Sequence, residues 1–266
     1  MPFRHIRYIR KPLCNAANNL ETSLVDLLPG DVRHQQAASW SPGEGRTRTS
    51  GQHTQPSTLV YLARHGQTES NRQSRYAGYS SEPITDAGRA QMRALASRLA
   101  PCGVGEIWTS EVPRARESAE LVGQVLGAPI RTDARLNEMR LGPWEGMTEA
   151  EVAREFPTAH AVWCELPDQL VLDGRETLDA VAARVTSAVS DAIHQRHPVL
   201  LMSHVAPIRV AVLRALGLPL RRYKLLHMGN GDGVVIDRAK ADARRLGEDR
   251  SLQDELSGSG PKSSVA

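Results

Sequence analysis

Between residues 58 and 238, short apolar runs alternate with segments of helical periodicity, and few folds accommodate that order of elements. Five runs have the length and composition of strands, at residues 58–63, 106–110, 129–132, 198–203 and 233–237. Helical spacing of i, i+3, i+4, i+7 appears between them, as in Met92, Leu95, Ala96 and Leu99. Strands that alternate with helices predict a mostly parallel sheet covered on both faces. We therefore expect one α/β domain over residues 58–238.

The two flanks differ from this central part in composition. Residues 1–57 show no sustained hydrophobic periodicity and end in a polar stretch. Residues 239–266 are also mostly polar and contain a Ser-Gly-Ser-Gly-Pro segment near their end. Such segments bury too little apolar surface to offset the entropy of ordering them, so we expect a disordered N-terminal extension and a disordered tail. A targeting or partner-binding arm is the alternative for residues 1–57.

Charge and composition exclude several classes of protein. The formal net charge of +3 lies entirely in residues 1–57, where seven Lys or Arg face four Asp or Glu, so the predicted domain is neutral. A neutral domain offers no basic stripe to nucleic acid. No apolar run approaches the length of a membrane span. The three cysteines, Cys14, Cys102 and Cys164, are far apart and odd in number, which is typical of reduced thiols in a cytoplasmic protein.

The first predicted strand runs directly into Arg64-His65-Gly66. Ligands bind at the carboxyl ends of strands in α/β sheets. Arginine presents a planar fork of donors that suits phosphate, and a neutral histidine offers a ring nitrogen that can attack phosphorus. Gly66 permits close backbone approach, so that a carbonyl could hold the tautomer of the ring. The alternative is a surface Arg-His pair that merely ends a strand.

Two more strand ends carry residues of the same kind. Arg114 follows the second strand just after Pro113, which suits the first turn of a helix, and a helix N-terminus attracts anions. His204 follows the strand at residues 198–203. Each alone has an ordinary alternative, an exposed arginine or a hydrogen-bonded core histidine, but together they indicate an anion site at one edge of the sheet.

Four motifs in order resemble those of the histidine phosphatase superfamily, the phosphoglycerate-mutase-like family. They are Arg64-His65-Gly66, Ser110-x-x-x-Arg114-Ala115, Leu136-Asn137-Glu138-x-x-x-Gly142-x-Trp144-Glu145-Gly146 and Ser203-His204, and they span nearly the whole predicted domain. The resemblance implies a three-layer α/β/α fold, no metal and no cofactor.

The resemblance also implies roles for individual residues. His65 is expected to be phosphorylated, and Glu138 to protonate the leaving oxygen and then activate water. The transferring phosphoryl group is expected to be held by Arg64, Asn71, Arg114, His204 and the backbone N–H of Val205. The chain departs from the family pattern at Val205-Ala206-Pro207, where glycines are common, and at Arg175, which replaces the second glycine of a Gly-Gly-Glu-Ser stretch.

Hydrolysis is favoured over mutase activity. Only 23 residues separate Arg114 from Glu138, and Ser70 stands where the related mutases commonly carry tryptophan. The related mutases commonly carry a long insertion around the Glu138 motif, and the shorter segment of this chain should exclude water less well than a mutase requires. The alternatives are a phosphoglycerate-type mutase, a phosphoprotein phosphatase and a catalytically silent protein that binds a phosphorylated ligand.

The expected substrate is a small metabolite phosphate, most simply a sugar or cyclitol phosphate, because aromatic side chains in the surrounding loops can stack on a ring. The candidate substrate-wall residues are Tyr76, Tyr79, Trp163 and Arg175. The same aromatic residues could equally serve only to pack the domain.

Overall fold

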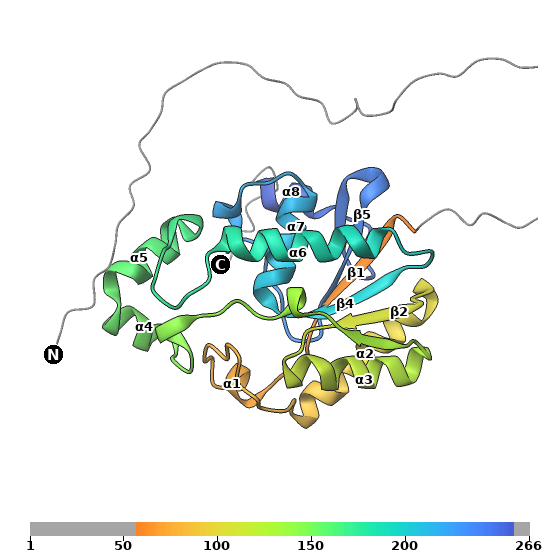
Figure 1. The fold of residues 1–266 in the computed structure, drawn as a ribbon, viewed down its shortest axis with the longest axis horizontal. Coiled ribbons are helices and arrows are strands. Elements are labelled where there is room, and N and C mark those ends of the chain that lie inside the picture. Colours follow the sequence, from red (N-terminus) through yellow and green to blue (C-terminus); the bar gives the residue numbers. More distant parts are fainter. Residues whose placement is uncertain (1–56, 258–266) are drawn as a thin grey trace, which may run out of the picture. The chain divides into compact units, whose positions relative to one another are not determined.

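The computed structural model describes residues 57–257, so nearly all of the predicted N-terminal extension lies outside the described residues (Figure 1). A single six-stranded sheet has the order β3-β2-β4-β1-β5-β6. Its strands are β1 (Leu59–Arg64), β2 (Glu106–Thr109), β3 (Ile130–Thr132), β4 (Val199–Ser203), β5 (Gly233–Asp237) and β6 (Asp242–Arg245). The first five lie within a residue of the runs expected from the sequence.

The directions of the strands determine which residues meet at one edge of the sheet. Strand β4 pairs in parallel with both β1 and β2, and β3 extends the parallel part beyond β2. Strand β5 runs antiparallel to β1, with Tyr61 opposite Val235. The sheet is thus mostly parallel, as predicted. Because β1, β2 and β4 run the same way, Arg64, Thr109 and Ser203 end at one edge of the sheet, and the polar residues that follow them meet there.

Helices cover both faces of this sheet (Figure 1). Helices α2 (Asp86–Leu99) and α3 (Pro113–Leu126) pack on one face, and α6 (Leu178–Ile193) and α7 (Val205–Ala215) pack on the other. Neighbouring residues of a strand point to opposite faces of the sheet and so belong to different hydrophobic cores. Leu200 packs with α2 and α3, whereas Leu201 packs with α6 and α7. Buried side chains on both faces explain why β4 reads as a continuous apolar run. The predicted three-layer α/β/α fold is confirmed.

The remaining helices are short. They are α1 (Glu69–Arg72), α4 (Glu149–Glu155), α5 (Pro157–Glu165) and α8 (Leu252–Ser257). Thr148 and Glu151 form a capping box at the start of α4. The loop after α1 lies beside the start of α4, since Tyr76 N–H donates to the Met147 carbonyl over 2.9 Å. In the part of the chain that the structure describes, no helix is long and apolar enough to cross a membrane.

The predicted domain boundary at residue 238 is too early. Strand β6 pairs antiparallel with β5, and Leu252 and Leu256 of α8 are buried in the core that α6 and α7 cover. Strand β6 was missed because its sequence, Asp-Ala-Arg-Arg, contains one apolar side chain, Ala243, which is fully buried. Residues 239–257 therefore belong to the domain, and the rest of the predicted tail lies outside the described residues.

Candidate active site

His65 stands immediately after β1, almost completely buried. Its Nδ1 lies 2.7 Å from the carbonyl oxygen of Gly66. A carbonyl only accepts hydrogen bonds, so Nδ1 carries the proton and Nε2 keeps its lone pair. Gly66 is required here because a Cβ at that position would lie 2.6 Å from the Gly88 carbonyl oxygen. The backbone thus fixes His65 in the tautomer of a nitrogen nucleophile at Nε2.

Arg114, in the first turn of α3, directs its guanidinium at that nitrogen. Its Nε donates to His65 Nε2 over 3.0 Å, and one Nη donates to the Gly78 carbonyl over 2.7 Å. The side chain is 1% exposed, yet no carboxylate of the described residues lies within ion-pair distance of it. A buried cation without a protein counterion is costly, and a bound anion would supply the missing charge.

His204 faces the same arginine from the end of β4. Its Nε2 donates to Ser110 Oγ over 2.8 Å, and Ser110 Oγ donates in turn to Asn137 Oδ1 over 2.9 Å. Its Nδ1 lies 3.2 Å from Arg114 Nη2, and its ring lies edge-on to that of His65, with centroids 5.0 Å apart. Ser110 therefore orients His204 so that Nδ1 faces the guanidinium of Arg114, which also contacts His65.

The pKa values reflect this crowding of cationic groups. Burial, and then the charge of Arg114, hold the pKa of His65 and that of His204 well below their ordinary value of 6.5. Burial also lowers the pKa of Arg64 to about 10. One Nη of Arg64 donates to the Met228 carbonyl over 2.8 Å, and its buried Nε has no partner among the described residues. We call this group of two neutral histidines and two arginines the histidine pocket, and a bound anion would balance the charge of its arginines.

Glu138 lies in the loop that follows the short helical turn Ala134–Leu136, and its carboxylate reaches the N-terminal turn of α7. Its Oε1 accepts hydrogen bonds from Met139 N–H over 2.9 Å and from Ala206 N–H over 3.3 Å. Its negative charge favours the charged forms of both Arg64 and Arg114. Glu138 therefore presents a carboxylate to the arginine pair without forming a direct ion pair with either.

The other two predicted phosphate ligands border the same pocket. Val205 is the first residue of α7, whose N-cap is His204, so its backbone N–H belongs to the unpaired donors of a helix N-terminus. Asn71 is linked to His65 through Asn230, whose amide donates to Asn71 Oδ1 over 2.8 Å and to the His65 carbonyl over 3.2 Å. Val205 and Asn71 are thus each tied to one of the two histidines, Val205 by the chain and Asn71 through Asn230.

Two supporting residues were not predicted from the sequence. Arg184 of α6 donates to the carbonyls of Arg135, Asn137 and Glu138, over 2.8, 2.6 and 3.2 Å. Ser118 of α3 accepts from Gly66 N–H over 3.0 Å. The contacts of both join residues far apart in the chain, so no local pattern reveals them. Arg184 holds the segment that carries Glu138, and Ser118 holds the segment that carries His65.

The four candidate wall residues divide into two pairs. Tyr79 is 39% exposed and lies between the two residues whose carbonyls contact Arg114, and Tyr76 is half-buried beside the core. Trp163 is only 4% exposed and Arg175 only 7%, with the guanidinium 4.1 Å from the centroid of the Trp163 ring. Trp163 and Arg175 therefore belong to the core in this structure and not to an open substrate wall.

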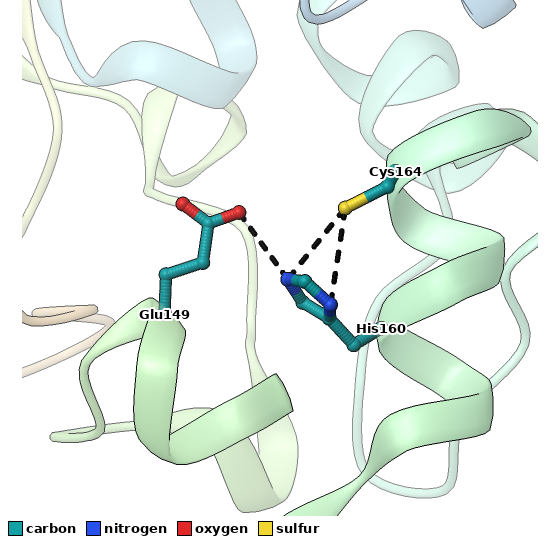
Figure 2. A group of neighbouring side chains, drawn as sticks. All are labelled: Glu149, His160 and Cys164. Carbon is teal, nitrogen blue, oxygen red and sulfur yellow. Dashed lines mark hydrogen bonds and ion pairs between the residues drawn. The ribbon is translucent and has the colours of Figure 1, made fainter. Parts of the chain in front are cut away.

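One group of potential metal ligands occurs in residues 57–257, namely Glu149, His160 and Cys164 on helices α4 and α5 (Figure 2). It shares no residue with the histidine pocket. In the pocket itself, positive charge is supplied by arginine side chains, and carboxylates do not cluster there in the manner of metal ligands.

The comparisons with known proteins agree with this geometry. Residues 60–246 match the histidine phosphatase superfamily (branch 1). A glucosyl-3-phosphoglycerate phosphatase of Mycolicibacterium vanbaalenii is 34% identical over 187 residues, which cover 66% of this chain and 83% of the relative. An adenosylcobalamin/alpha-ribazole phosphatase of Salmonella typhimurium is 30% identical over 162 residues, covering 60% of this chain and 80% of the relative.

Solved structures give the same result. A mycobacterial glucosyl-3-phosphoglycerate phosphatase in complex with VO3 has a TM-score of 0.61 and 30% identity, over 66% of this chain and 90% of that one. The chain belongs to the histidine phosphatase superfamily. Within that superfamily it is a phosphatase, a hydrolase of phosphoric monoesters.

Proposed function

We propose that the chain hydrolyses a small metabolite phosphate, a sugar or cyclitol phosphate, through a phosphohistidine at His65 and without a metal ion. The observation that carries the proposal is the pairing of His65 Nε2, unprotonated and buried, with the Arg114 Nε–H at 3.0 Å. A phosphoryl group in this space has a nucleophile on one side and donors around its equatorial oxygens.

The first chemical step forms a bond between His65 Nε2 and phosphorus and breaks the bond from phosphorus to the ester oxygen. The departing oxygen takes a proton from Glu138, which enters the step as a carboxylic acid. Arg64 and Arg114 stabilise charge on the phosphoryl oxygens, and His204 donates from Nδ1 once the phosphate dianion beside it favours its protonated form. The products of this step are the alcohol and phosphohistidine.

In the second step a water molecule attacks phosphorus. Glu138, now a carboxylate, accepts a proton from that water, and the electron pair of the nitrogen–phosphorus bond returns to His65 Nε2. Inorganic phosphate leaves, and Glu138 is again protonated for the next turnover. Two arginines and a second histidine supply the positive charge that a divalent cation supplies in other phosphoryl-transfer sites.

The proposed substrate class has two supports. Relatives are named for glucosyl-3-phosphoglycerate and for alpha-ribazole, both small molecules. In this chain, the exposed ring of Tyr79 lies beside the arginine pocket, where it can stack on the ring of a substrate. A phosphoprotein and 3-phosphoglycerate are the competing substrates.

The test is a hydrolysis panel on the full-length protein after treatment with EDTA. Sugar phosphates, cyclitol phosphates, a phosphopeptide and 3-phosphoglycerate are compared by phosphate release, and isomerisation of 3-phosphoglycerate is followed separately. We expect the highest kcat/KM on a sugar or cyclitol phosphate. Activity should be lost in His65→Ala and kept in the control variant His194→Ala, because the His194 imidazole is exposed at the C-terminal end of α6. Dependence on added metal, or a preference for the phosphopeptide, would overturn the proposal.

A further inference from the structure

We propose that Glu149, His160 and Cys164 form a binding site for a divalent transition metal, best suited to zinc, that joins helix α4 to helix α5. The three side chains converge, and their ligand atoms all lie within 4.8 Å of one another. Figure 2 shows the Glu149 carboxylate approaching the imidazole from α4, and the thiol approaching the same ring from α5. The site is separate from the phosphatase pocket and does not depend on the proposed function.

Helix geometry brings two of the ligands together. His160 and Cys164 are four residues apart on α5, so they share one face of the helix. The same spacing holds metal-ligand pairs on helices in other proteins. Glu149 is the first residue of α4, which the capping box of Thr148 fixes in place. The site is therefore built on two helices, with one ligand from α4 and two from α5.

Two of the three distances between ligand atoms match those of a tetrahedral zinc site, and the third is at most 4.8 Å. Zinc binds nitrogen and oxygen at about 2.0 Å and sulfur at about 2.3 Å, so a tetrahedral ion holds nitrogen and oxygen about 3.3 Å apart and nitrogen and sulfur about 3.5 Å apart. In this chain His160 Nε2 lies 3.3 Å from Glu149 Oε1 and 3.6 Å from Cys164 Sγ. An ion could therefore contact all three atoms with small movements of the Glu149 and Cys164 side chains, which are exposed.

The chemistry of the ligands favours zinc over magnesium and calcium. Thiolate and imidazole suit zinc, whereas the other two ions prefer sites made of oxygen ligands. Three protein ligands leave a fourth position for water. Glu149 and Cys164 are exposed, so an ion can enter from solvent.

Lys224 shows that a cation is already held beside these ligands. Its Nζ lies 3.5 Å from Cys164 Sγ and 3.8 Å from Glu149 Oε1. A metal ion at the proposed position replaces this ammonium group, whose four-carbon stem allows it to swing into solvent. Removing the competing charge in Lys224→Met should therefore raise metal affinity by up to about fivefold, the effect of one partly exposed charge pair.

The direct test is a cobalt(II) titration of the full-length, reduced protein, because cobalt bound to a thiolate gives a charge-transfer absorption that other ligands do not give. We expect one equivalent to produce this band in the wild type, and Cys164→Ser to abolish it. His160→Ala should lower zinc affinity, measured by competition with cobalt, by more than about 100-fold. The matched controls Cys14→Ser and Cys102→Ser should keep the band.

A second measurement, of secondary structure and thermal stability, shows whether the variants are folded. Cys164 is exposed, so Cys164→Ser should retain the circular dichroism spectrum and apo thermal midpoint of the wild type. Zinc should raise the midpoint of the wild type and leave that of Cys164→Ser unchanged, since an ion bound only to the folded state stabilises it. Absence of the band in the wild type, or its persistence in Cys164→Ser, would overturn the proposal.

Discussion

Replacing Glu138 by glutamine should separate the proposed acid from the phosphate ligands. The Glu138 Oε1 accepts two backbone N–H groups, and the glutamine carbonyl can accept the same two, so the variant should keep the local structure and lose only the transferable proton. An alkoxide departs from a sugar phosphate with difficulty unless it is protonated, whereas nitrophenolate departs readily. Glu138→Gln should therefore reduce hydrolysis of the sugar phosphate far more than hydrolysis of p-nitrophenyl phosphate.

The expected size follows from general acid catalysis, which contributes about 10²–10⁴-fold. This corresponds to about 2.7–5.4 kcal/mol of transition-state stabilisation. The assay is kcat/KM for both esters, because this parameter reports formation of the phosphohistidine and not the shared hydrolysis step. Arg114→Lys is the matched control, since Arg114 touches the nucleophile and should affect both esters alike. Equal losses for both esters in Glu138→Gln would refute the acid role.

Three further predictions concern the surroundings of the pocket. Because the pKa values of His65 and His204 lie well below 6.5 in the folded state, the unfolded chain binds more protons below that pH. The free energy of unfolding should therefore fall as the pH is lowered from about 7.5 to 5.5, by at most about 1.4 kcal/mol per pH unit for each histidine, and a flat urea-denaturation profile would contradict this. Arg184→Met should displace the backbone of Glu138 and reduce kcat/KM by up to about 10²-fold for a sugar phosphate but less for p-nitrophenyl phosphate, whereas equal losses would indicate general unfolding. Arg175 is a buried cation without hydrogen-bond partners among the described residues. Its two contacts with indole rings are worth about 2 kcal/mol each, which the cost of burying an unpaired charge offsets, so Arg175→Met should leave stability unchanged or raise it by about 1 kcal/mol in urea denaturation. A loss of several kcal/mol in that variant would show that the cation itself is required.

The two histidines and Arg114 were predictable from the sequence because they lie at, or a few residues after, the carboxyl ends of buried strands. His65 and His204 follow β1 and β4, and Arg114 opens the helix after β2, so the order of elements alone brings them to one edge of the sheet. The parallel direction of these strands follows from the helices between them. Local patterns therefore located the residues that occupy the centre of the pocket.

Other features depend on contacts that local patterns do not encode. Arg184 meets the carbonyl of Asn137 at a separation of 47 residues along the chain. Strand β6 is held in the sheet by pairing with β5 and carries no apolar run of its own. Trp163 has the composition of a stacking residue, but its neighbours in the fold, including Tyr223 at 5.2 Å between ring centroids, make it part of the core.

The central claim is that the phosphoryl group passes through His65, and trapping that intermediate tests it most directly. The full-length protein is mixed with a sugar phosphate, quenched within the first turnover without acid, and digested for mass spectrometry. We predict phosphate on His65 in the wild type, at increased occupancy in Glu138→Gln with p-nitrophenyl phosphate, because the base for the second step is then absent. Phosphate found on another residue, or its absence under conditions that preserve phosphohistidine, would contradict the mechanism.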